Sequence, residues 1–331
     1  MKRLMRVVSI LLLLSAVVAL SRRPQAAAVS SLDLNEIPSP RSGHALTYDR
    51  RNQRLVLYGG IDAQQQRLAD TWVWDGKWRR LTAEGPGPRL DAQMVFDTKR
   101  GRAVLFGGMG EKERQGDTWE LDGAQWKRTA TMGPEARNLF AMAYDEQRGR
   151  AVLFGGQNSA RQRLGDTWEW DGQQWLRVSE VGPPPRGSHS MVYHARRKKV
   201  LLLGGFNDKA LGDLWEWDGK SWKQAPQSAA PPRMHFAMGY DAKRSRLVLF
   251  GGFGESNRIG DTWEWDGKTW KSFNVEGPPA RAEHEGAYVP GSGFVICGGI
   301  VGQGMAVAER TRVNDLWLWN GGAWRKLDAP N

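Results

Sequence analysis

Hydrophobic and polar residues repeat along this chain in blocks, with successive spacings of 48, 48, 49, 47 and 47 residues. Within a block, larger and smaller residues tend to alternate, as at 140–144, and this period of two predicts a β-strand. A polar turn and a short apolar run follow, and the run is typical of a strand buried on both faces. Each apolar run ends at a glycine pair: Gly59 and Gly60, Gly107 and Gly108, Gly155 and Gly156, Gly204 and Gly205, Gly251 and Gly252, Gly298 and Gly299.

The second half of each block predicts two more strands. In the third block, Trp168 and Trp170 fall on one face of a strand that begins after Asp166, because neighbouring side chains alternate between faces. The following Asp171 and Gly172 suit a tight turn between antiparallel strands, and Trp175 opens the fourth strand. Six blocks of four short strands predict 24 strands in all.

A single four-stranded sheet of this kind would expose apolar residues on both faces. Stacking the sheets radially buries these residues, and closing the ring leaves only short edges. The sequence therefore predicts an all-β fold, a six-bladed β-propeller with four antiparallel strands per blade. Two tryptophan positions occur in every block and are expected to pack between sheets, each ring burying about 150–250 Å²: Trp72, Trp119, Trp168, Trp215, Trp263 and Trp317, and Trp78, Trp126, Trp175, Trp222, Trp270 and Trp324.

Three features make the chain resemble kelch-repeat proteins over about residues 41–327. These are the glycine pair after the second strand, the later aromatic residues, and the opening run of Arg41, Ser42, Gly43 and His44. The resemblance implies a single kelch-type propeller at 41–331, after a lead-in at 29–40. Each blade is continuous in sequence, whereas many kelch propellers share one blade between both chain ends; whether 29–40 edges the last blade stays open. The expected blades are approximately 41–88, 89–136, 137–185, 186–232, 233–280 and 281–331.

Residues 1–28 have the pattern of a bacterial-type signal peptide. Basic residues precede an apolar run at 7–20, and small residues at 26–28 suit cleavage. A 14-residue apolar run is short for a membrane span, so no stable span is expected after cleavage. We expect export to the periplasm or the outside, and the alternative is an uncleaved anchor, with Arg22 and Arg23 as a stop.

Charge and cysteine content narrow the function less than the repeat does. The net charge of +11 falls by five to +6 once the predicted leader is removed, a mild excess that favours anionic surfaces in general. The turns after the first strands are basic, which suits a solvated face or a dock for an anionic polymer or membrane. They lack aromatic residues for base stacking, so no nucleic-acid partner is expected. The single cysteine, Cys297, excludes an internal disulfide and occupies a packed apolar position.

Strand direction places the arginine that opens each block and the aspartate before each third strand on one face of the ring. The two could form ordered pairs, because an arginine fork suits a carboxylate. Alternatively, the arginines could line a mouth that binds carboxylates or phosphates. The arginines are Arg41, Arg89, Arg137, Arg186, Arg233 and Arg281, and the aspartates are Asp70, Asp117, Asp166, Asp213, Asp261 and Asp315.

The loops after the glycine pairs break the sixfold symmetry. The last, at 300–314, is the longest and carries Arg310 and Arg312. Binding residues concentrate on loops held by a rigid scaffold, and the kelch resemblance implies partner peptides on this face. We therefore expect an exported protein-binding or scaffolding module, with a protein or peptide partner or an anionic glycan.

Enzymatic function is less favoured but stays open. His44, His189 and His284 share one repeat position with an alanine and two phenylalanines elsewhere, which suits packing better than metal binding. Glu283, His284 and Glu285 are weak catalytic candidates. Periplasmic N-acetylneuraminate mutarotases are similar signal-bearing kelch proteins, and this resemblance implies an acidic-sugar enzyme as an alternative. A lectin is a further alternative. The copper site of galactose oxidase-like enzymes needs a Tyr–Cys cross-link, which Cys297 does not suit, so we expect no cofactor and no metal.

Overall fold

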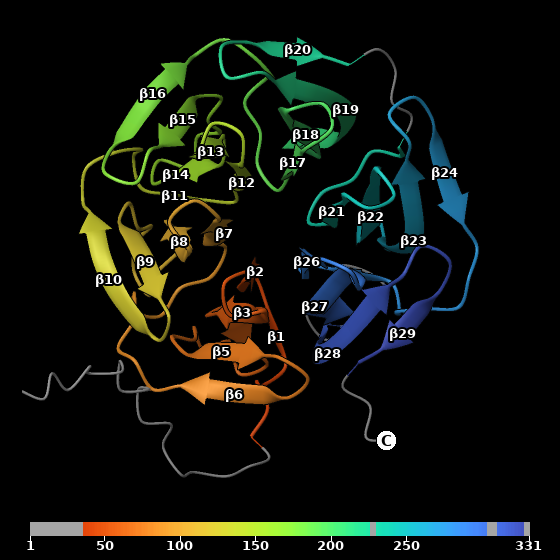
Figure 1. Cartoon of the computed structure of the whole chain (residues 1–331), viewed down its shortest axis with the longest axis horizontal. Coiled ribbons are helices and arrows are strands. Elements are labelled where there is room, and N and C mark those ends of the chain that lie inside the picture. The colour runs from red at the N-terminus through yellow and green to blue at the C-terminus, as the bar shows by residue number, and fades with distance from the viewer. Residues whose placement is uncertain (1–35, 226–229, 303–309, 328–331) are drawn as a thin grey trace, which may run out of the picture.

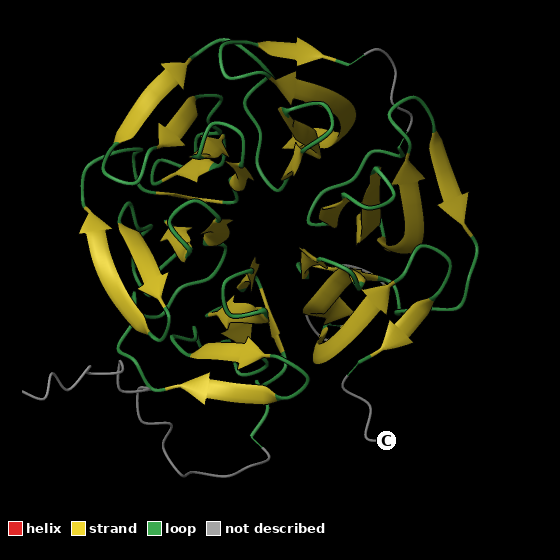
Figure 2. Ribbon diagram, in the orientation of Figure 1, coloured by secondary structure: helices red, strands yellow, loops and turns green. Residues whose placement is uncertain are grey.

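A computed structural model describes residues 36–225, 230–302 and 310–327. In this part, six blades of four antiparallel strands stand radially around a central axis (Figure 1), as the sequence predicts, and β25 adds a short fifth strand to the sheet of the last blade. Strands and loops make up all of it (Figure 2), so no helix suited to crossing a membrane occurs among these residues. The predicted signal peptide at 1–28 and most of the lead-in lie outside the described residues.

Each blade runs in chain order from the innermost to the outermost strand. Blades one to three consist of β2 (Ala45–Asp49), β3 (Arg54–Tyr58), β5 (Thr71–Trp74) and β6 (Trp78–Leu81); β7 (Gln93–Asp97), β8 (Arg102–Phe106), β9 (Thr118–Asp122) and β10 (Gln125–Ala130); and β12 (Ala141–Asp145), β13 (Arg150–Phe154), β15 (Thr167–Trp170) and β16 (Trp175–Ser179). Blades four to six consist of β17 (Ser190–His194), β18 (Lys199–Asn207), β19 (Lys209–Trp217) and β20 (Trp222–Gln224); β21 (Ala237–Asp241), β22 (Arg246–Phe253), β23 (Arg258–Trp265) and β24 (Trp270–Phe273); and β26 (Glu285–Val289), β27 (Gly293–Val301), β28 (Thr311–Trp319) and β29 (Trp324–Lys326).

Short strands at the start of some blades tie the opening arginine to the loop after the glycine pair of the same blade. β1 pairs with β4, β11 with β14, and β25 with the end of β27. These pairings place the backbone of the arginine beside the end of the second strand. The short strands are β1 (Arg41–Ser42), β4 (Ile61–Asp62), β11 (Arg137–Asn138), β14 (Gln157–Asn158) and β25 (Arg281–Ala282).

The ring closes by packing the last blade against the first, without exchange of a strand between them. Leu57 and Trp72 of the first blade share a buried cluster with Leu316 of the last, and both blades are continuous in sequence, as predicted. The end of the lead-in touches the last blade, because the Asn314 amide donates to the Pro38 carbonyl at 2.7 Å. Residues 36–40 form no strand there.

The tryptophans of the fourth strands connect neighbouring blades. The indole N–H of Trp222 donates to Thr167 Oγ1 of the preceding blade at 2.8 Å, and Trp175 makes the same bond to Thr118. The Trp222 ring also packs edge-on against Phe154 of that blade. These tryptophans therefore pack between neighbouring sheets.

Trp270 tests how much the hydrogen bond adds to this packing. Its buried indole nitrogen has no partner, because Leu214 occupies the place that Thr167 takes in the preceding blade. We expect Trp222→Phe to lower the free energy of unfolding by about 1 kcal/mol more than Trp270→Phe, the usual net worth of a buried hydrogen bond. Urea denaturation of the two variants measures the difference; equal losses would show that only ring packing matters.

Candidate functional site at the mouth of the central channel

The opening arginines are buried and hold the aspartate before the third strand. In the third blade, Arg137 donates from Nη1 to the Gly155 carbonyl at 3.0 Å and to Asp166 Oδ1 at 2.7 Å, and from Nη2 to Asp166 Oδ2 at 2.9 Å. Trp168 donates its indole N–H to the same carboxylate at 2.7 Å. The same ion pair occurs in every blade: Arg41 with Asp70, Arg89 with Asp117, Arg137 with Asp166, Arg186 with Asp213, Arg233 with Asp261, and Arg281 with Asp315.

The carboxyl group of Asp166 is ionised at neutral pH. Burial opposes the charge of Asp166, but the hydrogen bonds and charge of Arg137 outweigh it and hold the pKa of this carboxyl below its usual value. Each fork is occupied by a carboxylate and a glycine carbonyl, and the arginine side chains are at most 2% exposed. This arrangement favours the interpretation of the opening arginines as structural groups over that of a ligand-binding ring.

The glycine pair links each fork to the next blade. A Cβ on Gly59 would lie 2.7 Å from the carbonyl of Arg89, the opening arginine of the second blade. Gly60 donates its N–H to the same carbonyl at 2.9 Å. At the closing junction, a Cβ on Gly298 would lie 2.9 Å from the Arg41 carbonyl. The close approach of two backbones thus requires glycine at the first position of the pair.

A collar of six residues surrounds the mouth of the channel, two positions after each opening arginine. All six have left-handed φ values between 53° and 60°. At five of the six junctions between blades, the collar N–H donates to the collar carbonyl of the preceding blade; Asp91 N, for example, lies 2.7 Å from Gly43 O. The geometry recurs while the side chains differ, in the order Gly43, Asp91, Leu139, Ser188, His235 and Glu283.

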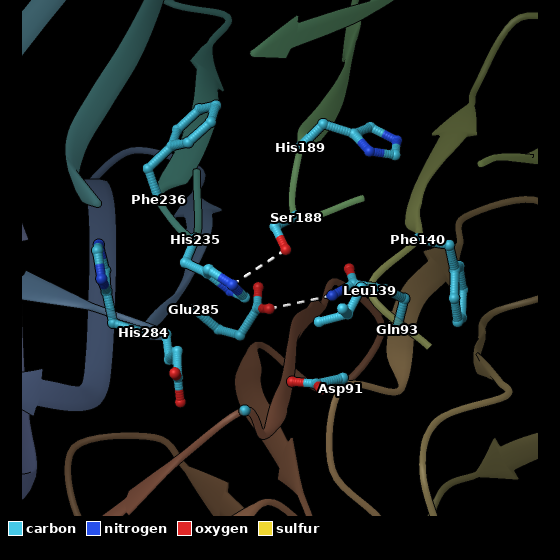
Figure 3. A pocket seen from close by; sticks show the side chains of 12 residues that line it. Asp91, Gln93, Leu139, Phe140, Ser188, His189, His235, Phe236, His284 and Glu285 are labelled. Carbon is cyan, nitrogen blue, oxygen red and sulfur yellow. Dashed lines mark hydrogen bonds between the residues drawn. The ribbon is translucent and has the colours of Figure 1, made fainter. Parts of the chain in front are cut away.

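Polar side chains from the collar and the innermost strands converge on a cavity of about 50 Å³ at this mouth (Figure 3). Gln93 donates to Glu285 Oε1 at 3.0 Å, and Ser188 Oγ lies 3.0 Å from His235 Nε2. Asp91 borders the same space. A polar cavity of this size has room for a few water molecules or the tip of a polar side chain.

Asp91 and Glu285 hold their protons at unusually high pH. Burial, reinforced by the charge of Glu283, raises the pKa of Asp91 to about 7. Burial, reinforced by Asp91, raises the pKa of Glu285 to about 8, although the Gln93 hydrogen bond acts in the opposite direction. Burial lowers the pKa of His235, and the charge of Glu283 offsets part of this effect. A cation entering the cavity would favour the ionised carboxylates.

Comparison with known families agrees with this architecture. A family model described as the KLHDC2/KLHL20/DRC7 Kelch-repeats domain matches residues 25–171, which include the first two blades and the first three strands of the third, and the remaining blades repeat the same strand order. The chain is thus a six-bladed β-propeller whose first half matches kelch repeats. No match was found among curated protein sequences.

All three catalytic candidates border the cavity at the mouth of the propeller, but only the two glutamates bond to polar side chains there. Glu283 accepts a hydrogen bond from Ser42 Oγ at 3.0 Å, and Glu285 accepts one from Gln93. His284 instead packs edge-on against Phe250, with Nε2 3.2 Å from the Phe250 carbonyl. Burial lowers the pKa of His284 to about 3, so this ring is neutral at physiological pH.

The remaining candidates are held by the scaffold or lie at its edge. His44 and His189 are buried like His284, as expected for packing positions. Arg312 is buried and donates from Nε to Ser42 Oγ at 3.1 Å, whereas Arg310 is exposed. Residues 303–309 of the long loop lie outside the described residues. Across 36–225, 230–302 and 310–327, no three His, Cys, Asp or Glu side chains are grouped to hold a metal ion.

Four polar residues of the mouth were not predicted from the sequence. They are Asp91, Gln93, Ser188 and His235. The sequence did contain a signal, because the positions two and four residues after the opening arginine change their chemistry from block to block, whereas the arginine itself recurs in all six blocks. Only the last block was singled out, since its two glutamates flank a histidine.

The structural role of the forks predicts a large cost for Asp166→Asn. Removing one charge leaves Arg137 buried without its counterion, a change that costs about 3–5 kcal/mol of unfolding free energy. The control is Glu180→Gln in the exposed Arg177–Glu180 pair, which should cost less than about 1 kcal/mol. Chemical denaturation checks both, and equal effects would contradict the role assigned to the forks.

The acids of the mouth predict that stability falls as pH rises from 6.5 to 8.5. The folded chain keeps the protons of Asp91 and Glu285 up to pH about 7 and 8, while the unfolded chain loses them near pH 4. Each group then lowers unfolding free energy by up to about 1.4 kcal/mol per pH unit until it ionises. Asp91→Asn with Glu285→Gln should flatten this slope in urea titrations, and an unchanged slope would refute the assignment.

Proposed function

We propose that this kelch propeller is an exported binding module and that a protein or peptide partner docks on the face that carries the collar. One observation carries the proposal: the six blades share the groups that hold them together and differ at the two positions that border the mouth. The forks, glycine pairs and tryptophans recur, whereas the collar changes from Gly43 to Asp91 to Leu139 in the first three blades alone. A site that recognises one orientation of a partner needs such asymmetry.

The chemistry of the mouth suits a cationic group of the partner. Asp91, Glu283 and Glu285 border the cavity together with His235, and no lysine or arginine is among its lining residues. A lysine or arginine side chain can place hydrogen-bond donors against several carboxylates at once. The partner would then insert a basic side chain into the mouth and cover the surrounding loops. An anionic glycan would meet like charge there.

The two alternatives from the sequence have less support. An acidic-sugar enzyme would need arginines free to hold a carboxylate, but the six opening arginines are already paired with aspartates. A lectin would need exposed tryptophans, but Trp175 and Trp222 are buried between blades. Export remains part of the proposal, supported by the residue pattern at 1–28.

Peptide selection tests the proposal. Peptides selected from a random library against residues 29–331 should contain lysine or arginine, and Glu283→Gln with Glu285→Gln should weaken their binding about tenfold, or ~1.4 kcal/mol. The matched control, Glu111→Gln with Glu113→Gln, makes the same two substitutions in an exposed loop of the same face and should change affinity by less than about twofold. Removal of the predicted signal peptide at 1–28 would give a mature protein, recovered from native cells, that begins close to residue 29.

Two outcomes would overturn the proposal. Selected peptides that lack basic residues, or that bind both variants equally well, would show that the mouth does not recognise the partner. Faster anomer exchange of N-acetylneuraminate in the presence of the propeller, followed by NMR and lost with Glu283→Gln and Glu285→Gln, would favour the enzyme instead.

A further inference from the structure

The other end of the central channel is a second cavity of different chemistry. It has a volume of about 260 Å³ and is lined by side chains of the innermost strands. Five residues after the opening arginine, four blades place a methionine there and a fifth places Leu46: Met94, Met142, Met191 and Met238. Methionine is polarisable and adapts its shape, so these side chains form a pliable apolar wall.

An aromatic residue from each blade stands around the open end of this cavity, seven positions after the opening arginine. The hydroxyl groups of two of them are committed to the neighbouring blade. Tyr144 donates to Asp97 at 2.5 Å, and Tyr288 donates to Asp241 at 2.9 Å. Water inside the methionine-lined part would find few hydrogen-bond partners, and an apolar group displaces such water readily.

Three cationic residues each follow, in the sequence, a residue that lines the rim of this opening. Thr98, Ala195 and Ala242 border the cavity, and the next residue in each case is an exposed cation: Lys99, Arg196 and Lys243. Neither an ion pair nor a side-chain hydrogen bond involves these three cations within the described part of the chain.

Other arginines of the same turns are already paired. Arg148 binds the carboxylates of Asp145 and Glu169, and Arg244 binds those of Asp241 and Glu264. The basic turns predicted from the sequence are therefore not a uniform positive surface. Lys99, Arg196 and Lys243 lie beside the opening of the cavity, whose lining also includes the ion pair between Arg50 and Glu146.

We propose that this end of the channel binds an amphipathic anion, such as a medium-chain carboxylate. The apolar chain lies among the methionines, and the anionic head is held at the rim by Lys99, Arg196 and Lys243. The acidic mouth at the opposite end does not accept such a ligand, so the two ends of one channel bind groups of opposite charge.

Titration calorimetry with octanoate, below its micelle concentration, tests this site on residues 29–331. Octanoate should bind saturably at one site per chain, whereas acetate, which lacks the chain, and octylammonium, which has the opposite charge, should not. Lys99→Glu, Arg196→Glu and Lys243→Glu together should weaken octanoate binding at least about tenfold. Ala242→Trp, which places a bulky ring at the rim, should weaken it similarly.

The matched control reverses three exposed lysines elsewhere on the molecule. Lys77→Glu, Lys127→Glu and Lys220→Glu change the net charge equally, lie in turns or strands at the outer edge of the blades, and should leave affinity within about twofold. All substituted residues are exposed, so the melting temperatures of both triple variants should stay close to that of the parent.

Several results would overturn the proposal. No saturable binding of octanoate, equal binding of octylammonium, or binding that survives both Ala242→Trp and the rim triple variant would each exclude the site. Binding of inorganic polyphosphate without binding of octanoate would show that the cations bind anionic polymers at the surface and that the cavity binds no apolar chain. Octanoate binding should be unchanged by Glu283→Gln with Glu285→Gln, so failure of the peptide site and failure of this site are distinguishable.

Discussion

The buried arginine fork is the interaction on which the rest of the propeller depends. The guanidinium of Arg137 donates hydrogen bonds to both oxygens of Asp166 and to the Gly155 carbonyl, and Asp166 also accepts a hydrogen bond from the indole N–H of Trp168. One cluster thus joins the start of a blade, the end of its second strand and its third strand. A buried charge is tolerable only when it is paired and hydrogen-bonded in this way. Because this cluster occurs in all six blades, it stabilises the whole propeller.

The same cluster explains how a chain without strand exchange closes into a ring. The carbonyl of each opening arginine receives the glycine pair of the preceding blade, as Arg89 receives Gly60. At the closing junction, Arg41 lies against Gly298, and Gly43 donates its N–H to Glu283 at 3.1 Å. The last junction is therefore built like the others, from close backbone contact and packed side chains. Closure needs no special device at the chain ends.

The fold could be predicted from the sequence because each rule that forms it is local and repeated. Period-two runs, glycine pairs and Asp-Gly turns act within a few residues, and six copies make each pattern unmistakable. The arginine and its aspartate are 29 residues apart in the third block, and their residue types suit a structural pair or a ligand site equally well. Only the burial of Arg137 separates the two.

The mouth could be predicted only in part, for a different physical reason. Glu283 and Glu285 stood out because they flank a histidine, but Asp91 and His235 are single polar residues in separate blocks. Their proximity arises from ring closure, which brings equivalent positions of all blades to one axis. Residues that are unremarkable within one repeat become a site when six repeats converge, so differences between repeats are the pattern to follow.

The opposite chemistry of the two channel ends has a simple origin in the short innermost strand. Positions two and four after the opening arginine border the mouth, and positions five and seven lie deeper and toward the other face. Because a strand of five residues spans the channel, a shift of three residues moves a side chain from one mouth to the other. The collar joins neighbouring blades through backbone hydrogen bonds, which different side chains permit, whereas the deeper positions border the packed core. Acids could therefore accumulate at one end, while the other had to remain apolar and could acquire charge only in the turn beyond it.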